Sequence, residues 1–564
     1  MTHILLIITI ASMQLAYSMY AQGRAGQSGS SFAAITDSLS RLPALTTAAM
    51  VLSPLAGMLV AYAFFARFAG KRMDATGRIN PYFKAESLAR KLNILAALWL
   101  SLSFFLFNWT SAAAALVAPI DPAQLAHATS TIPNSFADTT STAVTYRLTL
   151  LTAIIAILPL GITTASLAGA FYPLYRRVQE AMLYRNLEEG ATVYPIPSRG
   201  RYILNDFRYN ALIVLTPVFI AKVCSDLFDY SERAYPDIFT SYPIFSDLSF
   251  LITLLVVIFL TPPILGMAWG LVRIGPSQLT QLTDAARKLQ KVRFSGPYLW
   301  PTSGTIPNAM VLGWFWPARY LIFTDVLLDK LEGTHLEAVI GHELAHIRQR
   351  HSLWILISLT ASILVWGWIF SAAVYFAHLN PDDESLSHLS TALGLIFTLL
   401  TFGFVSRRFE WQADALSLAY MSARRGYPFI DPAAAVALKG ALTRVAALAG
   451  INEHASSFRH GSIALRKEKV DELLFASLPN QHNPELIPSP SGHPVVPNLR
   501  TLAPHRTANW IKSLSLIALA AGLVPFIFFS PATPNASYTP PDQQSNHPDS
   551  QRRLSQHEDR SPPP

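Results

Sequence analysis

Long apolar runs alternate with polar stretches along most of the chain. A spanning helix needs roughly 20 mostly apolar residues, and we identify nine candidate runs, of which the fifth is short and contains Lys222. They are Ile4–Tyr20, Pro43–Phe65, Ile94–Val117, Leu148–Phe171, Ala211–Cys224, Leu248–Leu271, Leu353–Phe376, Leu389–Val405 and Trp510–Phe529. The pattern predicts a mainly α-helical, multi-pass membrane protein. Only His3 precedes the first run as a basic residue, which favours an anchor helix over a cleaved signal peptide.

Lys and Arg are concentrated in every second loop between these runs. The loops after the second and fourth runs are basic, as are 272–352 and 406–509, whereas 118–146 contains neither Lys nor Arg. Basic loops stay on the cytoplasmic side of a membrane. We therefore expect the cell (inner) membrane, with residues 272–352 and 406–509 at the cytoplasmic face. If the fifth run is a re-entrant or surface helix, this assignment reverses for all later loops.

Composition supports the membrane interpretation and excludes several kinds of site. Hydrophobic residues make up 51% of the chain and charged residues 14%, against about 25% charged in soluble domains. The net charge of +8 follows the basic loops, and no nucleic-acid-binding motif accompanies it. Cys224 is the single cysteine, so an internal disulfide and a cysteine-based metal site are both excluded.

The segment THLEAVIGHELAHIRQRH, residues 334–351, contains a His-Glu-x-x-His pattern. Thr334 and Glu337 have the spacing of a capping box, which predicts a helix start. On that helix His342 and His346 project from one face and can bind one zinc ion, while Glu343 reaches the metal-bound water as general base. Chance predicts on the order of 0.01 occurrences of this pattern. The alternative is a pair of surface histidines on an amphipathic helix.

A catalytic zinc site with one position open for water needs a third protein ligand. In the segment SRRFEWQADALSLA, residues 406–419, Glu410 and Asp414 lie four residues apart and share a helix face. Glu410 suits direct ligation, and Asp414 suits a hydrogen bond that fixes the tautomer of a ligating imidazole, which we expect to be His342. Without the upstream His-Glu-x-x-His motif, we would interpret Glu410 and Asp414 as an ordinary pair of exposed acids.

Three blocks in this order resemble the CAAX prenyl protease and HtpX-type family of membrane zinc metallopeptidases, which are gluzincin-like. They are NAMVLGWFWPARYLIFTDVLLDKL at 308–331, HELAH with Gly341 before it and Arg350-His351 after it, and Glu410-x-Gln-Ala-Asp414. The likeness covers roughly 275–425 and weakens towards about 505. It implies a zincin-type domain with a small β-hairpin or sheet, one Zn²⁺ per chain, and Glu410 as third ligand.

The resemblance also implies how a substrate binds. An extended peptide would lie against the strand formed by Asn308, Ala309, Met310, Val311 and Leu312, held by backbone hydrogen bonds. Met310, Val311 and Leu312 can equally be strand core.

A block GHPVVPNLR, residues 492–500, is similar to a downstream His-Pro block of the family, with Arg500 one residue farther from His493 than expected. His493 or Arg500 can steady the oxyanion, or His493 can occupy the open zinc position. A loop histidine in a Pro-rich stretch is an equal alternative. The remaining histidines, including His351 and His460, are expected to be solvated or structural.

These features predict four regions. Residues 1–272 form an N-terminal membrane region with about six apolar segments, and 273–509 form the metallopeptidase domain, interrupted by membrane helices at 353–376 and 389–405. A C-terminal membrane helix covers 510–529, and 530–564 is a Pro-rich disordered tail.

The predicted activity is zinc-dependent hydrolysis of peptide bonds in membrane or membrane-proximal proteins, with protein substrate and lipid bilayer as partners. One alternative is an intramembrane site-2-type protease that would use an acid of the NPDD stretch, 380–383, such as Asp382. The other is a non-catalytic membrane scaffold with a residual metal site.

Overall fold

The computed structural model describes residues 43–117, 150–242, 244–380, 384–427, 429–477 and 503–528, and six single positions before residue 43. Helices dominate these residues, and one small sheet accompanies them. The predicted fold class is confirmed. Most of the first apolar run, the NPDD acids Asp382 and Asp383, His493, Arg500 and the C-terminal tail lie outside the described residues.

Six helices of the described part are long and apolar enough to cross a bilayer, and a bent pair adds a seventh candidate. The chain is thus an integral, multi-pass membrane protein. The fifth predicted run, the shortest, lies within the helical stretch Arg199–Ala234, which is one of these six candidate spans. The helices are α3 (Ala44–Thr76), α7 (Leu150–Glu188), α9 (Leu212–Ala234, after α8 at Arg199–Asp206 and a π-helical turn), α11 (Ile244–Trp269), α15 (His351–Phe376) and α16 (Glu384–Arg424).

The third predicted run differs from a single straight helix. It is divided between α4 (Asn80–Leu106) and α5 (Trp109–Val117), whose axes differ by 84°. Asn108 at the break has a left-handed φ of 46°, a conformation that Asn adopts more readily than most residues. The indole N–H of Trp109 then donates to the carbonyl of Ala156 on α7, which ties α5 to that helix.

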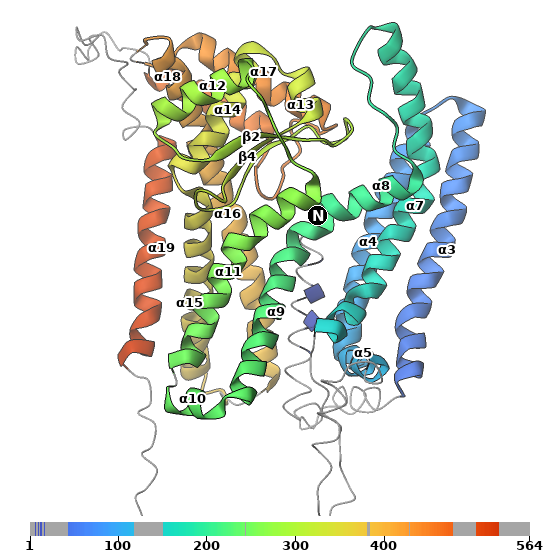
Figure 1. Ribbon diagram of the computed structural model, residues 1–564, viewed down its shortest axis with the longest axis vertical. Helices are drawn as coiled ribbons and strands as arrows, with labels where there is room; N and C mark the ends of the chain where they lie inside the picture. Colours follow the sequence, from blue (N-terminus) through green and yellow to red (C-terminus); the bar gives the residue numbers. More distant parts are fainter. Residues whose placement is uncertain are drawn as a thin grey trace, which may run out of the picture.

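The helices form two groups that are visible in Figure 1. On one side α3, α4, α5 and α7 pack around shared clusters of buried apolar side chains. On the other side α9 packs against α11, and α15 packs against both α16 and α19 (Ala503–Phe528). The sheet lies at one end of this second group together with α12 (Gln278–Gln290), α14 (Gly333–Arg348), α17 (Pro432–Leu448) and α18 (Ile463–Ser477), whereas the short helix α10 (Pro236–Ser241) lies at the other end (Figure 1).

The sheet has the strand order β1-β2-β4-β3. Its strands are β1 (Val272–Arg273), β2 (Ser295–Trp300), β3 (Ala309–Leu312) and β4 (Tyr320–Thr324). β2 runs parallel to β4, whereas β3 is antiparallel to β4 with Met310 opposite Ile322. β3 is therefore an edge strand, and its outer edge is available for backbone hydrogen bonds.

One hydrophobic core joins the sheet to the helices beside it. Leu321 and Phe323 of β4 are fully buried together with Leu344 of α14 (Gly333–Arg348) and Leu418 of α16. The core also includes residues of α12 (Gln278–Gln290), α13 (Asp325–Lys330), α17 (Pro432–Leu448) and α18 (Ile463–Ser477). Burial of this apolar surface fixes α14 between the sheet and α16.

Candidate metal centre and substrate cleft

The His-Glu-x-x-His segment lies on α14, but the predicted capping box is wrong. The helix begins at Gly333 after Glu332, whose side chain makes no capping hydrogen bond. Glu337 instead forms an ion pair of 2.6 Å with Arg424 on α16. Glu337 therefore links α14 to α16 and does not cap the start of α14.

A close approach between α14 and α16 brings the two halves of the site together. A Cβ added at Gly341 would lie 2.8 Å from Oγ of Ser417 and 2.9 Å from the Tyr420 ring. The Ser417 hydroxyl donates to the carbonyl of Ala338 at 2.7 Å. Glycine at 341, directly before His342, is thus required for this close contact between the helices.

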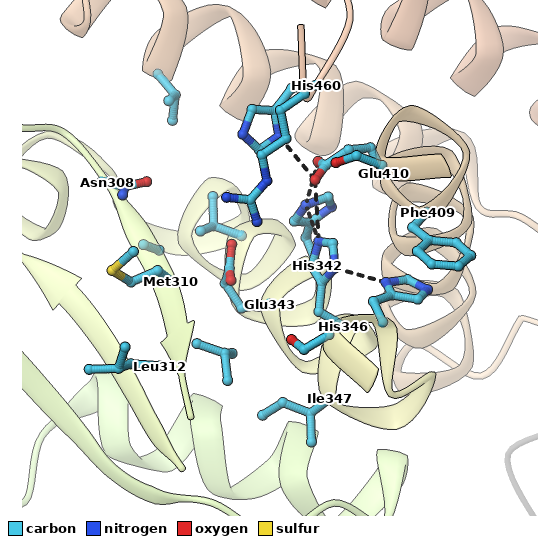
Figure 2. A pocket seen from close by; sticks show the side chains of 18 of the residues that line it. Asn308, Met310, Leu312, His342, Glu343, His346, Ile347, Phe409, Glu410 and His460 are labelled. Atoms are coloured by element: carbon cyan, nitrogen blue, oxygen red, sulfur yellow. Dashed lines mark hydrogen bonds and ion pairs between the residues drawn. The ribbon is translucent and has the colours of Figure 1, made fainter. Parts of the chain in front are cut away.

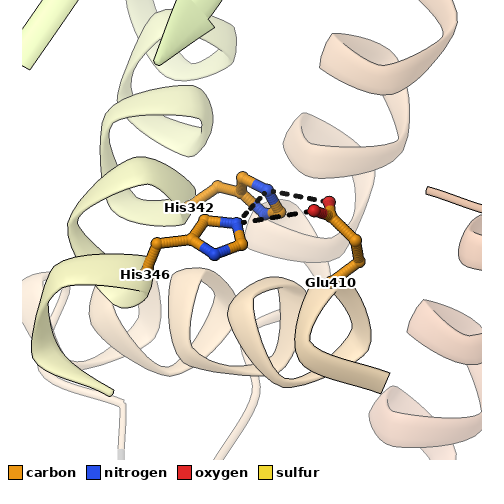
Figure 3. A group of neighbouring side chains, drawn as sticks. All are labelled: His342, His346 and Glu410. Carbon is orange, nitrogen blue, oxygen red and sulfur yellow. Dashed lines mark hydrogen bonds and ion pairs between the residues drawn. The ribbon is translucent and has the colours of Figure 1, made fainter. Parts of the chain in front are cut away.

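Figure 3 shows His342 and His346 of α14 facing Glu410 of α16. Nε2 of His342 lies 3.2 Å from Nε2 of His346 and 3.4 Å from Oε2 of Glu410. Nε2 of His346 lies 3.7 Å from Oε1 of Glu410. In tetrahedral zinc sites with bonds of 2.0–2.2 Å, neighbouring ligand atoms are about 3.3–3.5 Å apart. The three side chains therefore fit one divalent cation.

Their electrostatics suit a cation as well. Burial would lower the pKa of His342, but hydrogen bonds to Asp414 and Glu410 outweigh it and raise this pKa to about 10. The carboxylates thus favour positive charge between these side chains. Burial lowers the pKa of His346 well below its usual value, so this imidazole is neutral, as a metal ligand must be.

Asp414 lies behind His342, on the far side of its ring from the other ligand atoms. Its Oδ1 is 2.9 Å from Nδ1 of His342. Arg466 of α18 binds both carboxylate oxygens of Asp414, at 2.8 and 2.7 Å, and all three residues are buried. The bidentate guanidinium fixes the carboxylate, which in turn fixes the His342 ring with Nε2 directed at the site.

A different, uncharged chain supports His346. Nδ1 of His346 lies 2.8 Å from Nδ1 of His351, and Nε2 of His351 lies 2.9 Å from Oε1 of Gln412. The amide oxygen can only accept, so Nε2 of His351 carries the proton and its Nδ1 accepts from His346. Nε2 of His346 is then left with a lone pair that faces Glu410. The His351 ring also stacks on Phe409, with ring centroids 4.6 Å apart. His351 was expected to be solvated or structural, and its contact with His346 was not predicted.

Glu343 lies beside the two histidines and faces β3 (Figure 2). Burial raises the pKa of its carboxyl to about 7, although the nearby positive charges of His342, Arg459 and Arg466 oppose the shift. A cation held by His342, His346 and Glu410 would add to that opposition. The Glu343 carboxylate then remains ionised and able to accept a proton.

These residues line a cavity of about 1000 Å³ that extends from the metal site along β3. Figure 2 shows Asn308, Met310 and Leu312 along one wall, with Glu343 between them and the histidines. Ala309 and Val311 also line the cavity. The structure thus brings all five residues of the predicted substrate strand to the site.

His460 was expected to be solvated or structural, but it contacts the site. Its Nδ1 lies 3.0 Å from Oε1 of Glu410 (Figure 2). The loop that carries it is anchored to α16, because a Cβ at Gly403 would lie 2.9 Å from the Phe458 ring and Arg407 donates to the Phe458 carbonyl at 3.1 Å. The Ser-Phe-Arg-His-Gly stretch has turn-forming residues but no pattern that predicts this long-range contact.

Comparison with known proteins shows which family the second half of the chain resembles. Residues 287–561 match the sequence profile of peptidase family M48. The match covers just under half of the chain and shows that this part is similar to peptidase family M48. The M48 match includes α14, α16 and β3, and the predicted resemblance to HtpX-type and CAAX proteases is confirmed.

Two relatives are "Protease HtpX homolog" proteins from Archaeoglobus fulgidus and Pyrobaculum calidifontis. They are 24% identical over 241 residues and 27% identical over 233 residues, covering 41% and 39% of this chain. The chain spans less than two thirds of either relative, 65% and 58% of their lengths. The crystal structure of S. mikatae Ste24p is similar with a TM-score of 0.40 at 14% identity, over 75% of this chain and 98% of that one. The M48 family is one of metallopeptidases, which implies a metal cofactor for this chain.

Proposed function

We propose that the protein is a membrane-embedded zinc endopeptidase that hydrolyses peptide bonds of membrane or membrane-proximal proteins. The observation that carries the proposal is the spacing of the Nε2 atoms of His342 and His346 and the carboxylate of Glu410, at 3.2–3.7 Å. These residues would hold one Zn²⁺ per chain. The M48 match supports a metallopeptidase, and the tetrahedral spacing supports zinc.

The bound zinc would supply Lewis acidity for the scissile carbonyl and for water. Glu343 accepts the proton of the attacking water and passes it to the nitrogen of the leaving amine. Asp414 holds the tautomer of His342, and His351 holds that of His346. His493 and Arg500 remain our sequence-based proposal for steadying the oxyanion.

The free edge of β3 supports binding of an extended peptide. β3 pairs with β4 on one side only, and its residues line the cavity beside Glu343. A substrate strand hydrogen-bonded to the β3 backbone would be held whatever its side chains are. This mode of binding suits an enzyme that acts on many proteins.

The position of the membrane helices supports substrates at the bilayer surface. α15 begins at His351, directly after α14, and α16 contains both a predicted span and Glu410. Phe315, in the loop after β3, stacks on Phe259 of the membrane helix α11 with ring centroids 5.9 Å apart. The charge of the loops supports a location at the cytoplasmic face of the inner membrane.

The decisive experiment compares the full-length wild type with Glu343→Gln, in lipid nanodiscs and with zinc content measured. The wild type is expected to cleave an unfolded protein such as casein, and Glu343→Gln is expected to retain zinc and lose at least about 100-fold in activity. Glu468→Gln, an exposed carboxylate on α18, is the matched control. Equal cleavage by wild type and Glu343→Gln would refute the proposal.

The two alternatives are less well supported. A site-2-type protease would require the His-Glu-x-x-His helix within the bilayer, yet α14 is not among the candidate spans of the described residues. A scaffold with a residual metal site would have no need of a carboxylate at Glu343 between the histidines and the edge strand.

A further inference from the structure

Cationic residues line the substrate cavity on more than one side, and Arg459 and Arg466 lie near Glu343 and Glu410 on the side of His460. In Figure 2 the end near Leu312 and Ile347 lies opposite the end near Asn308 and His460. The chain continues from Leu312 into Trp314, and from Ile347 into Arg348, so both segments extend the Leu312 end. Five cationic residues line this part of the cavity, and we call them the basic end: Lys291, Arg293, Arg319, Arg348 and Arg350.

Direct contacts hold part of the basic end together. The guanidinium of Arg319 donates to the backbone carbonyl of Arg293 at 3.3 Å and to that of Trp314. Burial lowers the pKa of Arg319, and the positive charge of Arg350 lowers it further, which indicates that the two cations lie near one another. Lys291, Arg293, Arg348 and Arg350 are exposed and line the cavity.

These cations lack counter-ions in the described part of the chain. No described carboxylate lies within 4.0 Å of any of the five. The acidic residues that line the cavity are Glu343 and Glu410 alone among the described residues, and both face the metal site. A cavity wall with clustered, unpaired positive charge is complementary to an anionic ligand.

We propose that the basic end binds acidic side chains of the substrate and gives the enzyme a preference for acidic segments beside the cleavage site. This inference rests on the proposed function and adds a substrate class to it. Lipid headgroups are the rival ligand, because basic residues and exposed aromatic rings such as Trp316 also occur at membrane surfaces. The substrate is favoured because the cations share one cavity with Glu343 and the free edge of β3.

The register of the interaction follows from the direction of β3. Antiparallel pairing is the commoner arrangement in sheets, and a peptide antiparallel to β3 would enter at the Leu312 end. Its residues before the scissile bond would then lie at the basic end. Arg348, the last residue of α14, is five positions after Glu343, or about 7.5 Å along the helix at 1.5 Å per residue, and Arg350 follows it just beyond the helix end. At about 3.3 Å per strand residue, the acids belong roughly two to four residues before the scissile bond.

The test uses full-length protein in nanodiscs of zwitterionic lipid and a peptide library whose cut sites are identified by mass spectrometry. Wild type is expected to enrich Asp and Glu two to four residues before the cut. A matched Asp/Asn peptide pair made from one cut sequence is expected to differ about fivefold in kcat/KM, in line with exposed ion pairs. Raising salt from about 0.05 to 0.5 M shortens the screening length and should remove most of this difference.

The variant Arg293→Gln/Arg350→Asn removes two charges and leaves Arg319 with its backbone contacts. Asn at 350 suits the left-handed φ of 54° found there. This variant should reduce the Asp/Asn ratio to below two. Lys288→Gln/Arg444→Gln, two exposed cations outside the cavity, should retain the wild-type ratio.

Three results would overturn the inference: no acidic enrichment, enrichment only after the scissile bond, or a ratio that the cavity variant does not change. A cavity variant that changes only the response to nanodiscs containing phosphatidylglycerol would assign the basic end to lipid instead. Failure of the proposed function looks different, because wild type and Glu343→Gln would then cleave the library equally.

Discussion

Replacing His351 with Phe tests whether the chain from His346 through His351 to Gln412 positions a metal ligand. Phe retains a flat ring that can stack on Phe409, 4.6 Å from the native imidazole. It removes the acceptor that lies 2.8 Å from Nδ1 of His346. With metal bound, Nε2 of His346 must keep its lone pair, so Nδ1 must carry a proton in a buried place without that acceptor.

An unsatisfied buried donor costs about 1–3 kcal/mol. Because 1.4 kcal/mol corresponds to tenfold in affinity, zinc binding should weaken about 10- to 100-fold, which agrees with the usual effect of removing a hydrogen-bond partner of a metal ligand. Without metal, His346 can place its proton on Nε2 and donate towards Glu410, 3.7 Å away. Both forms lose the His351–Gln412 hydrogen bond, but only the zinc-bound form also leaves Nδ1–H of His346 unsatisfied, so the metal-free protein should be destabilised less than the zinc-bound protein.

The assay is competition for zinc against a chromogenic chelator, combined with thermal unfolding of the metal-free protein. His454→Phe, an exposed histidine outside the site, is the control and should bind zinc normally. Adding Gln412→Met to His351→Phe should cause no further loss, since both changes interrupt the same chain. Wild-type zinc affinity in His351→Phe would refute the reasoning, and equal loss of metal-free stability would assign the residue a packing role.

Three further predictions concern the same centre. Gly341→Val should separate α14 from α16, because its side chain would meet Ser417 and Tyr420. Thermal unfolding should show that the protein loses about 1–3 kcal/mol of stability, and its zinc content should fall. The control Gly367→Val, where a Cβ has no neighbour within 4 Å, should change neither the stability nor the zinc content. Arg466→Met should leave Asp414 buried without its cation and lower the free energy of unfolding by about 3–5 kcal/mol, measured by denaturant titration; a loss below about 1 kcal/mol would contradict the role given to the pair. Removing the metal with a chelator should lower the unfolding midpoint, and zinc at about 100 times its dissociation constant should restore about 2.7 kcal/mol of the free energy of unfolding. The His342→Gln/His346→Gln variant should not respond to zinc. A response of this variant equal to that of the wild type would place the stabilising ion elsewhere.

Local patterns in the sequence were enough to predict the membrane helices and to predict that residues of α14 and α16 form one site. Apolar runs identify membrane helices because the bilayer requires long uninterrupted apolar segments. The spacings of His342 with His346 and of Glu410 with Asp414 follow from helical periodicity. The bend at Asn108 was not predictable, because one residue in a left-handed conformation decides it.

Contacts between distant segments account for the rest of what was missed. His460 reaches Glu410 only because Phe458 fits against Gly403, and neither residue carries a signal of the other in the chain. Glu337 has the spacing of a capping residue, yet an ion pair with Arg424 is the contact it makes. Arg466 and Gln412 likewise gain their roles from packing between α16, α18 and the start of α15.

The 41 residues of α16 form one unbroken helix, whose first half is apolar enough to span the bilayer and whose second half supplies Glu410, Gln412 and Asp414. No loop separates the part solvated by lipid from the part that carries the proposed metal ligand Glu410. Cutting the chain at the membrane surface therefore cannot give a soluble fragment with an intact site, because the cut would pass through α16, the helix that carries Glu410 and Asp414. Any tilt that a thicker or thinner bilayer imposes on the lipid half is likewise transmitted along the same axis to the metal ligands.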